Sequence, residues 1–171
     1  MAVNIEIKAR VADLESLRQR VKNLADRPAE VLQQEDIFFH IAVGRLKLRQ
    51  QESGPGQLIY YNRPDVGGPK ASDYQIYPSA APDQLRVLLA DCLGERGVVK
   101  KTRWLYWVGN TRIHLDEVVG LGTFMELEVV LKDGQTVGEG EATAQALCQK
   151  LEIPASSLVE GAYIDLLEGQ G

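Results

Sequence analysis

Asn4-Ile5-Glu6-Ile7-Lys8-Ala9-Arg10 is the stretch of sequence that decides the fold class. Apolar and polar residues alternate through it, which is the periodicity of a β-strand with one buried face. Because successive side chains of a strand point to opposite faces, Glu6, Lys8 and Arg10 share one face and the isoleucines lie on the other. The first predicted strand, residues 4–10, therefore carries a row of charges along one face.

Charged rows of the same kind recur on later predicted strands. They are Arg45, Lys47 and Arg49; Lys101 and Arg103; Arg112, His114 and Asp116; and Glu126 and Glu128. On any single strand, such a row is what the wet face of an antiparallel sheet presents. Together the rows fit that explanation less well, because single-sign rows bring like charges close to one another. A polyanion lying among them would relieve this repulsion.

Turn signals arrange these strands in an α+β pattern dominated by hairpins. The predicted strands are residues 4–10, 35–41, 45–51, 57–63, 73–77, 98–108, 111–118 and 124–131. The predicted helices are residues 13–25, 82–93 and 141–151, with a short one ending near residue 167. Closing such a sheet into an antiparallel β-barrel would turn the charged rows inward around a small ligand cavity.

The composition sets the class of protein. A chain of 171 residues with 44% hydrophobic content can form one domain, and we expect residues 1–171 to do so. The net charge of −5 argues against a protein that coats nucleic acid, although an RNA 5′-triphosphate stays open as a ligand. No stretch approaches the roughly 20 apolar residues of a membrane span. We expect a cytoplasmic monomer or homodimer that does not bind membranes.

Carboxylates lie in or beside the basic rows and add a second chemistry. Magnesium binds few protein carboxylates and keeps waters or phosphate oxygens as its other ligands. Lysine and arginine hold phosphates, and arginine can do so with two parallel hydrogen bonds. Roughly three or more basic groups together with two or three acids are what a complex of a metal with a triphosphate requires. The competing interpretation is that the same acids form cross-strand salt bridges with the basic residues.

These residues, in this order, resemble the CYTH family, also called triphosphate tunnel metalloenzymes. Residues 4–8 are similar to its ExExK signature. The later matching motifs are Leu46-Lys47-Leu48-Arg49, Tyr61-Asn62-Arg63-Pro64, Lys101-Thr102-Arg103, His114-Leu115-Asp116-Glu117-Val118, Gly120-Leu121-Gly122, Glu126-Leu127-Glu128 and Tyr163-Ile164-Asp165-Leu166-Leu167. The resemblance implies a closed eight-stranded tunnel with flanking helices that binds a triphosphate substrate with Mg²⁺ or Mn²⁺.

The resemblance also implies roles for individual residues. Glu6, Glu126 and Glu128 look like metal ligands, with Asp116 as a further metal or water-orienting residue. The residues that look like phosphate ligands are Lys8, Lys47, Arg49, Arg63, Lys101 and Arg103. We add Arg112, on its charged row, and Lys70, which could reach a phosphate if the loop 64–72 closes as a lid.

The catalytic group is expected among the same residues. A lysine whose pKa is lowered by neighbouring positive charges could act as a general base, and Lys8 and Lys101 are the candidates, with Asp116 as a further catalytic residue. His114 is expected to be a hydrogen-bonded residue of the wall. One departure from the family pattern is Asn4, which replaces the first acid of ExExK and weakens or removes one metal site.

Three functions stay open at this point. The stretch 58–74 looks most like the class IV adenylate cyclase branch, which converts ATP to cyclic AMP and pyrophosphate. Tyr60, Tyr61, Phe39 and Trp104 could build the base pocket of a cyclase, although ordinary core packing is the favoured interpretation of these residues. The first alternative is a triphosphatase hydrolysing thiamine triphosphate, tripolyphosphate or a nucleoside triphosphate. The second is a non-catalytic sensor of a phosphate ligand or an RNA 5′ end.

Overall fold

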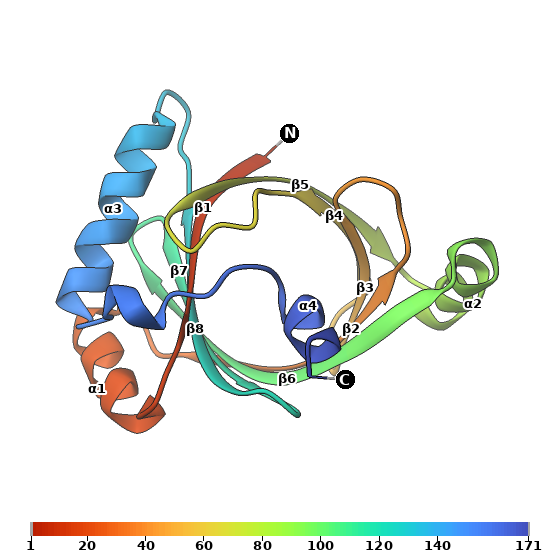
Figure 1. Cartoon of the computed structure of the whole chain (residues 1–171), viewed down its shortest axis with the longest axis horizontal. Helices are drawn as coiled ribbons and strands as arrows, with labels where there is room; N and C mark the ends of the chain where they lie inside the picture. The colour runs from red at the N-terminus through yellow and green to blue at the C-terminus, as the bar shows by residue number, and fades with distance from the viewer. Residues whose placement is uncertain (1, 171) are drawn as a thin grey trace.

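The computed structural model describes residues 2–170, and eight strands within them form a closed antiparallel barrel (Figure 1). The strands are β1 (Ala2–Arg10), β2 (Glu30–Phe39), β3 (Arg45–Gln51), β4 (Gly56–Asn62), β5 (Lys70–Ser79), β6 (Glu95–Val108), β7 (Thr111–Val118) and β8 (Gly122–Val130). Their order around the barrel is β1-β5-β4-β3-β2-β6-β7-β8. The fold class expected from the sequence is confirmed.

Three junctions close the barrel between strands that are not consecutive in the chain. They are β1 with β5, β2 with β6, and β1 with β8. β1 therefore lies between the two hairpin groups, and Glu6 pairs with Lys70 on one side and with Glu128 on the other. Because the barrel is closed, these junctions leave no free sheet edge. The charged face of each strand then points toward the same lumen.

Several strands are longer than the local sequence predicts, among them β2 and β5. β2 begins at Glu30, five residues before the predicted strand 35–41, because it pairs with β6 along its whole length. β5 begins at Lys70 and continues through Pro78, so the preceding loop is shorter than the predicted 64–72. Pro78 is tolerated because β1 pairs with β5 only as far as Tyr74, and no hydrogen bond to β1 is lost beyond that residue.

The helices lie outside the barrel, except for the last. They are α1 (Leu14–Leu24), α2 (Pro82–Leu93), α3 (Val137–Lys150) and α4 (Tyr163–Glu168), with a 3₁₀ turn at Ala155–Ser157. α3 begins four residues before its predicted start because Thr136 and Glu139 form a capping box. No helix within residues 2–170 is long and apolar enough to cross a membrane.

The main core lies between the outer face of the barrel and the helices α1 and α3, which cover the same side of it (Figure 1). Ile5 and Ile7 of β1 are buried there against residues such as Val21 of α1 and Leu147 of α3. The alternation of the opening stretch thus divides the strand as expected, with isoleucines outside and charges inside. Burial of the isoleucines stabilises the fold by about 1.5–3 kcal/mol each.

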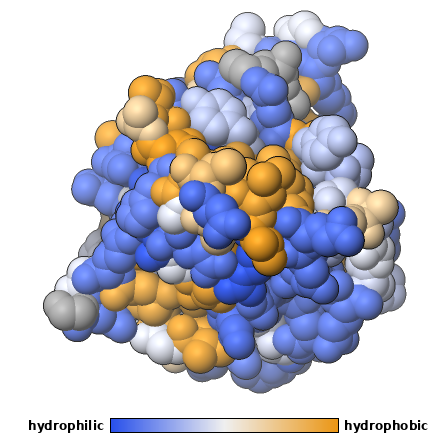
Figure 2. All heavy atoms as spheres, turned by 90° about the vertical axis from the view of Figure 1, so that its right-hand side faces the viewer, coloured by the Kyte–Doolittle hydropathy of each residue, from blue (hydrophilic) through white to orange (hydrophobic). Residues whose placement is uncertain are grey.

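α2 covers the opposite side of the barrel, over Ile37, Phe39 and Leu48. It contributes no fully buried residue, and Val87 and Leu88 lie exposed on it. Figure 2 faces this side of the molecule and shows hydrophobic side chains gathered among hydrophilic ones. This side of the barrel is therefore covered less completely than the side under α1 and α3.

α4 packs into one end of the barrel, where its apolar side chains join a buried hydrophobic cluster (Figure 1). Tyr163 and Ile164 contact lumen-facing residues of the strands, including Phe124, whose ring centroid lies 5.0 Å from that of Tyr163. Gly97 of β6 permits this approach, because a Cβ atom there would lie 2.7 Å from Cδ1 of Ile164. The charged part of the lumen is consequently bounded on one side by an apolar floor.

Candidate active site

The charged rows line a single cavity of about 280 Å³ in the barrel lumen. The sequence-predicted residues that line it are Glu6, Lys8, Lys47, Arg49, Arg63, Lys101, Arg103, Arg112, Glu126 and Glu128. Lys70 and Asp116 lie outside this lining, and both are buried. The structure therefore brings together residues from positions 6 to 128, which the sequence could group only by strand.

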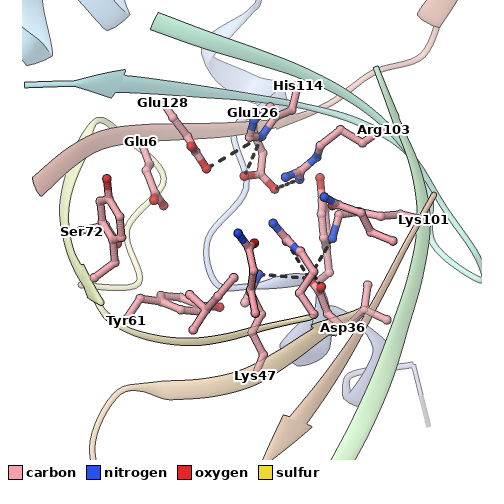
Figure 3. Close-up of a pocket in the computed structure, with 18 of the residues that line it drawn as sticks. Glu6, Asp36, Lys47, Tyr61, Ser72, Lys101, Arg103, His114, Glu126 and Glu128 are labelled. Carbon is pink, nitrogen blue, oxygen red and sulfur yellow. Dashed lines mark hydrogen bonds and ion pairs between the residues drawn. The ribbon is translucent and has the colours of Figure 1, made fainter. Parts of the chain in front are cut away.

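One side of the cavity, the acidic wall, consists of Glu6, His114, Glu126 and Glu128 (Figure 3). His114 Nδ1 lies 4.0 Å from Oε2 of Glu126 and 3.8 Å from Oε1 of Glu128. One ligand atom from each of these three residues lies within 4.8 Å of the others, an arrangement that could hold a metal ion. Sequence reasoning treated His114 as a wall residue, although its alternation with Asp116 already placed it on the charged face.

Glu6 completes the acidic wall and has an unusual proton affinity. Burial, followed by the negative charge of Glu128, raises the pKa of Glu6 to about 7. Arg63 partly offsets this effect, because its Nη1 donates a hydrogen bond to Oε2 of Glu6 at 2.9 Å. Burial opposes ionisation of Glu126 and Glu128 as well, but neighbouring positive charges lower the pKa of both, so the acidic wall holds ionised carboxylates that could bind a cation.

Asn4 lies beside the acidic wall at the position of the missing acid. It is 3% exposed, lines the cavity, and faces Ser72 across the β1–β5 ladder. Its Oδ1 atom has no hydrogen-bond partner among the described residues. The amide oxygen is therefore available to a ligand, but it brings no charge.

The opposite side of the cavity, the basic wall, consists of Lys47, Arg49 and Lys101 around the carboxylate of Asp36 (Figure 3). Asp36 accepts hydrogen bonds from Lys47 Nζ at 3.0 Å and from Lys101 Nζ at 2.9 Å. Arg49 donates to both of its oxygens at 2.8 Å. Burial opposes ionisation of Asp36, but the charge of Arg49 and the two lysines holds its pKa well below the usual range.

Sequence reasoning missed Asp36, although a signal was present. The residue lies in the predicted strand 35–41 and alternates with Phe38, which also faces the lumen. Asp36 directly follows Glu35, and its neighbours on the same face of the strand are Gln34 and Phe38, so the local pattern gives it no partner of opposite charge. Its register opposite Arg49 of β3, which the hairpin sets, reveals its role as the counter-ion of the basic wall.

Arg103 joins the two walls. Its Nε and Nη2 atoms donate to the two carboxylate oxygens of Asp116, each at 2.7 Å, and Nη2 also lies 3.4 Å from Oε1 of Glu126. The Tyr163 hydroxyl donates to Oδ2 of Asp116 at 2.7 Å. Both oxygens of the fully buried Asp116 are thus engaged, and this residue orients Arg103 from behind the cavity lining.

The two lysines predicted as general bases occupy different walls. Lys8 lies beside the acidic wall, with Nζ 3.2 Å from the carbonyl oxygen of Gly161 and 3.8 Å from Oε1 of Glu126. Burial lowers the pKa of Lys8 to about 8 and the pKa of Lys101 to about 7. At neutral pH, each lysine is therefore present partly in its neutral form, which can accept a proton.

The segment predicted as a lid is tied to the barrel. Arg45 donates to Asp65 in this loop at 2.9 Å and to Asp165 of α4 at 2.6 Å. Lys70 is the first residue of β5, and its Nζ donates to the carbonyl oxygen of Val66 at 2.8 Å. In this arrangement, Lys70 stabilises the loop and its ammonium group is not directed at the cavity centre. Closure of the loop over a ligand stays a prediction.

The aromatic residues expected around a nucleobase do not gather in one place. Tyr61 lines the cavity. Phe39 packs in the cluster under α2, and Trp104 packs outside the barrel, where the guanidinium of Arg18 lies 4.4 Å from its ring centroid. Tyr60 alternates with Tyr61 on β4 and does not line the cavity. Core packing, the competing interpretation, accounts for Phe39 and Trp104.

A closed eight-stranded barrel with a charged lumen is the fold of the triphosphate tunnel class. The sequence model of the CYTH domain matches residues 2–163, and the chain belongs to the CYTH family. The family resemblance expected from the sequence is confirmed.

Similar proteins carry related descriptions. A Methanocaldococcus jannaschii protein named "Putative adenylate cyclase MJ0240" is 21% identical over 174 residues, covering 96% of this chain and 98% of its own length. The structure of the Pyrococcus horikoshii protein PH1012 has a TM-score of 0.87 at 23% identity, covering 95% of this chain and 98% of that one. A Hippeastrum "putative adenylyl cyclase" described as having a dominant triphosphatase activity has a TM-score of 0.67 at 15% identity, covering 95% and 92%.

Proposed function

We propose that this chain binds a triphosphate together with a divalent cation in the barrel cavity and cleaves one of its phosphoanhydride bonds. The observation that carries the proposal is the opposition of the acidic wall and the basic wall across one cavity (Figure 3). Cross-strand salt bridging alone does not account for it, because the carboxylates of Glu126 and Glu128 converge on His114. A metal–polyphosphate complex matches both walls at once.

Mg²⁺ or Mn²⁺ fits the acidic wall. Carboxylate oxygens are the protein ligands that these hard cations prefer, and Glu126 and Glu128 present them close together. Burial, followed by the charge of Glu128, raises the pKa of Glu6 to about 7, and a bound cation would favour its ionised form. When bound, the cation would neutralise phosphate charge and polarise the reacting phosphoryl group.

The basic wall would hold the phosphates. Arg49 and Arg103 each use Nε and Nη2 to bind an aspartate, so that Nη1 takes no part in these pairs and is left for a phosphate oxygen. Because each guanidinium is already fixed by its aspartate, little side-chain entropy is lost when phosphate binds. The same cations would stabilise charge that develops on the phosphoryl oxygens in the transition state.

Hydrolysis is the reaction that the cavity supports best. Water would attack the terminal phosphorus, and its proton would pass to the neutral amine of Lys8. The bond between the terminal phosphorus and the bridging oxygen would break, with the electron pair leaving on the diphosphate. We assign this role to Lys8 because it lies beside the acidic wall, whereas Lys101 is held in the basic wall by Asp36.

The size of the cavity favours hydrolysis over cyclisation. A volume of about 280 Å³ is at the lower end of the roughly 300–1,000 Å³ typical of small-molecule sites. It suits the phosphate chain, with the organic part toward the mouth. Phe38, Tyr61 and Tyr74 line the cavity, so the small volume, and not the lining, is what favours hydrolysis.

A class IV adenylate cyclase activity is the second candidate, and the name of the M. jannaschii relative favours it. In this reaction, the ribose 3′ oxygen would attack the α-phosphorus and pyrophosphate would leave. The same acidic and basic walls would serve both reactions. The two differ in the attacking oxygen and in the phosphorus that is attacked.

Product analysis distinguishes these functions. Purified protein is incubated with ATP, thiamine triphosphate or tripolyphosphate, each with Mg²⁺ or Mn²⁺, and the products are separated. Release of orthophosphate would support the triphosphatase, and the compound cleaved fastest would identify its substrate class. Cyclic AMP with pyrophosphate would establish the cyclase. Tight binding without any product would replace both with a sensor of phosphate ligands.

A further inference from the structure

The imidazole of His114 lies in the acidic wall with an unsatisfied ring nitrogen. His114 is 4% exposed, and its Nδ1 atom has no hydrogen-bond partner among the described residues. The nearest oxygens, on Glu126 and Glu128, are 4.0 and 3.8 Å away, well beyond the roughly 2.7–3.2 Å of a hydrogen bond. A buried nitrogen without a partner is unfavourable, so this position calls for a ligand.

In both Glu126 and Glu128, one carboxylate oxygen faces basic residues and the other faces His114 Nδ1. Oε1 of Glu126 faces Lys8 and Arg103, and Oε2 of Glu128 faces Arg112. The other oxygen of each glutamate is the one that faces His114 Nδ1. Basic residues therefore compensate the outer oxygens, and the inner oxygens converge with the nitrogen on one point.

The two distances from His114 Nδ1 to the glutamate oxygens are compatible with a single metal ion at that point. With metal–ligand bonds of about 2.1 Å, adjacent ligands of an octahedral ion lie about 3.0 Å apart and opposite ligands about 4.2 Å apart. The separations of 4.0 and 3.8 Å fall between these limits. An ion much smaller than a water molecule could occupy this space even though the nitrogen itself is shielded from water.

We propose that His114 Nδ1 is a direct ligand of the divalent cation, together with Glu126 and Glu128, and that it shifts the preference of the site from Mg²⁺ toward Mn²⁺ and later first-row ions. This inference rests on the metal site of the proposed function. Magnesium prefers oxygen ligands and keeps its waters, whereas transition ions accept imidazole readily. The nitrogen ligand distinguishes this chain from a site made of carboxylates alone.

Mn²⁺ is the probe for the test, because it is paramagnetic and its spin echo is modulated by a directly bound nitrogen. The protein is titrated with Mn²⁺ and followed by electron paramagnetic resonance, and the echo modulation of the bound ion is then recorded. We expect a ¹⁴N coupling that changes to the ¹⁵N pattern when histidine alone is isotopically labelled. The chain contains only two histidines, so the matched control is straightforward.

The exposed His40 supplies that control. His40→Gln should retain the nitrogen coupling, and His114→Gln should abolish it. His114→Gln should also weaken Mn²⁺ binding by roughly tenfold or more, with a smaller change for Mg²⁺. The nitrogen coupling is measured first on the unmodified protein. The proposal therefore stays testable even if a variant fails to fold.

The remaining outcomes separate the two proposals. Mn²⁺ that binds tightly without any histidine nitrogen coupling would overturn the role of His114 and leave the carboxylate metal site standing. No Mn²⁺ binding, with or without tripolyphosphate present, would overturn both the role of His114 and the metal site of the proposed function.

Discussion

Arg103 and Asp116 form a bidentate ion pair inside the barrel, in which the Nε–Oδ1 and Nη2–Oδ2 distances are both 2.7 Å. Asp116 is fully buried, and the hydroxyl of Tyr163 donates to the same Oδ2 atom. An aspartate with both oxygens engaged is poorly available to a metal ion. The pair thus explains why an acid in a charged row serves to position an arginine.

Asp116→Asn tests this positioning role. We expect turnover to fall and the free energy of unfolding to decrease by about 3 kcal/mol, because the charge of Arg103 loses its main partner in a buried site. The affinity for Mn²⁺, measured by titration calorimetry, should stay unchanged. A loss of Mn²⁺ affinity comparable to that of a Glu126 variant would instead make Asp116 a metal ligand, as the sequence pattern suggested.

Glu126→Gln should abolish turnover and weaken Mn²⁺ binding while the fold is retained. The change removes one negative charge from the acidic wall at nearly constant volume, and circular dichroism checks the fold. Glu117→Gln is the matched control, because Glu117 lies exposed on the outer face of β7. Turnover near that of the unmodified protein in Glu126→Gln would refute the metal assignment.

Arg49→Ala should raise the KM for a triphosphate by roughly tenfold to a hundredfold, because a charge-assisted hydrogen bond contributes about 1.5–3 kcal/mol. Steady-state kinetics with the best substrate measure this effect. Lys22→Ala removes a positive charge at an exposed position of α1 and serves as the control. Equal effects of the two substitutions would mean that the basic wall does not bind phosphate.

Asp36→Asn should make the melting temperature depend more strongly on added tripolyphosphate. Without the carboxylate, Lys47, Arg49 and Lys101 repel one another, and the melting temperature should fall. Tripolyphosphate would supply the missing negative charge, so the rise in melting temperature on its addition should exceed the rise in the unmodified protein. An equal or smaller rise would show that Asp36 and phosphate do not share the same partners.

The lowered pKa of Lys101 predicts that the stability of the protein depends on pH. Burial, followed by nearby positive charges such as Arg49, lowers the pKa of Lys101 from 10.5 to about 7 in the folded protein. Between these values the unfolded chain binds more protons, so this group makes the free energy of unfolding rise with pH. Below about pH 7, both states are protonated, and the unfavourable contribution is at its full, constant value.

Urea unfolding at about pH 7 and about pH 10 measures this effect. Lys101→Met should reduce the difference in unfolding free energy between the two conditions. It should not remove the difference completely, because burial lowers the pKa of Lys8 and Lys70 to about 8 as well. A variant with the same pH dependence as the unmodified protein would show that Lys101 stays charged in the fold.

Local periodicity predicted much of this protein. The alternation in residues 4–10 and 45–49 assigned each side chain to a face, and Glu6, Lys8, Lys47 and Arg49 of the charged faces do line the cavity. Hairpin turns between consecutive strands set their antiparallel order, so β6, β7 and β8 lie as expected. These features depend on residues close together in sequence, and local sequence therefore contains them.

The contacts within the site could not be predicted in the same way. The partnership of Asp36 with Lys101 joins residues 65 positions apart, and that of Arg63 with Glu6 joins residues 57 apart. Each depends on the register at a junction that no hairpin sets. The convergence of His114 with Glu126 and Glu128 differs, because β7 and β8 are consecutive strands and the turn between them sets the register that pairs His114 with Glu126.

The sequence by itself determined which strands form, which residues face the lumen, and that the lumen is charged, because alternation along a strand is a local property. Only the tertiary structure decided that β1 closes the barrel between β5 and β8, that α4 fills one end, and which charge meets which. Those outcomes depend on pairing free energies and packing between distant segments, and periodicity within one segment carries no information about them.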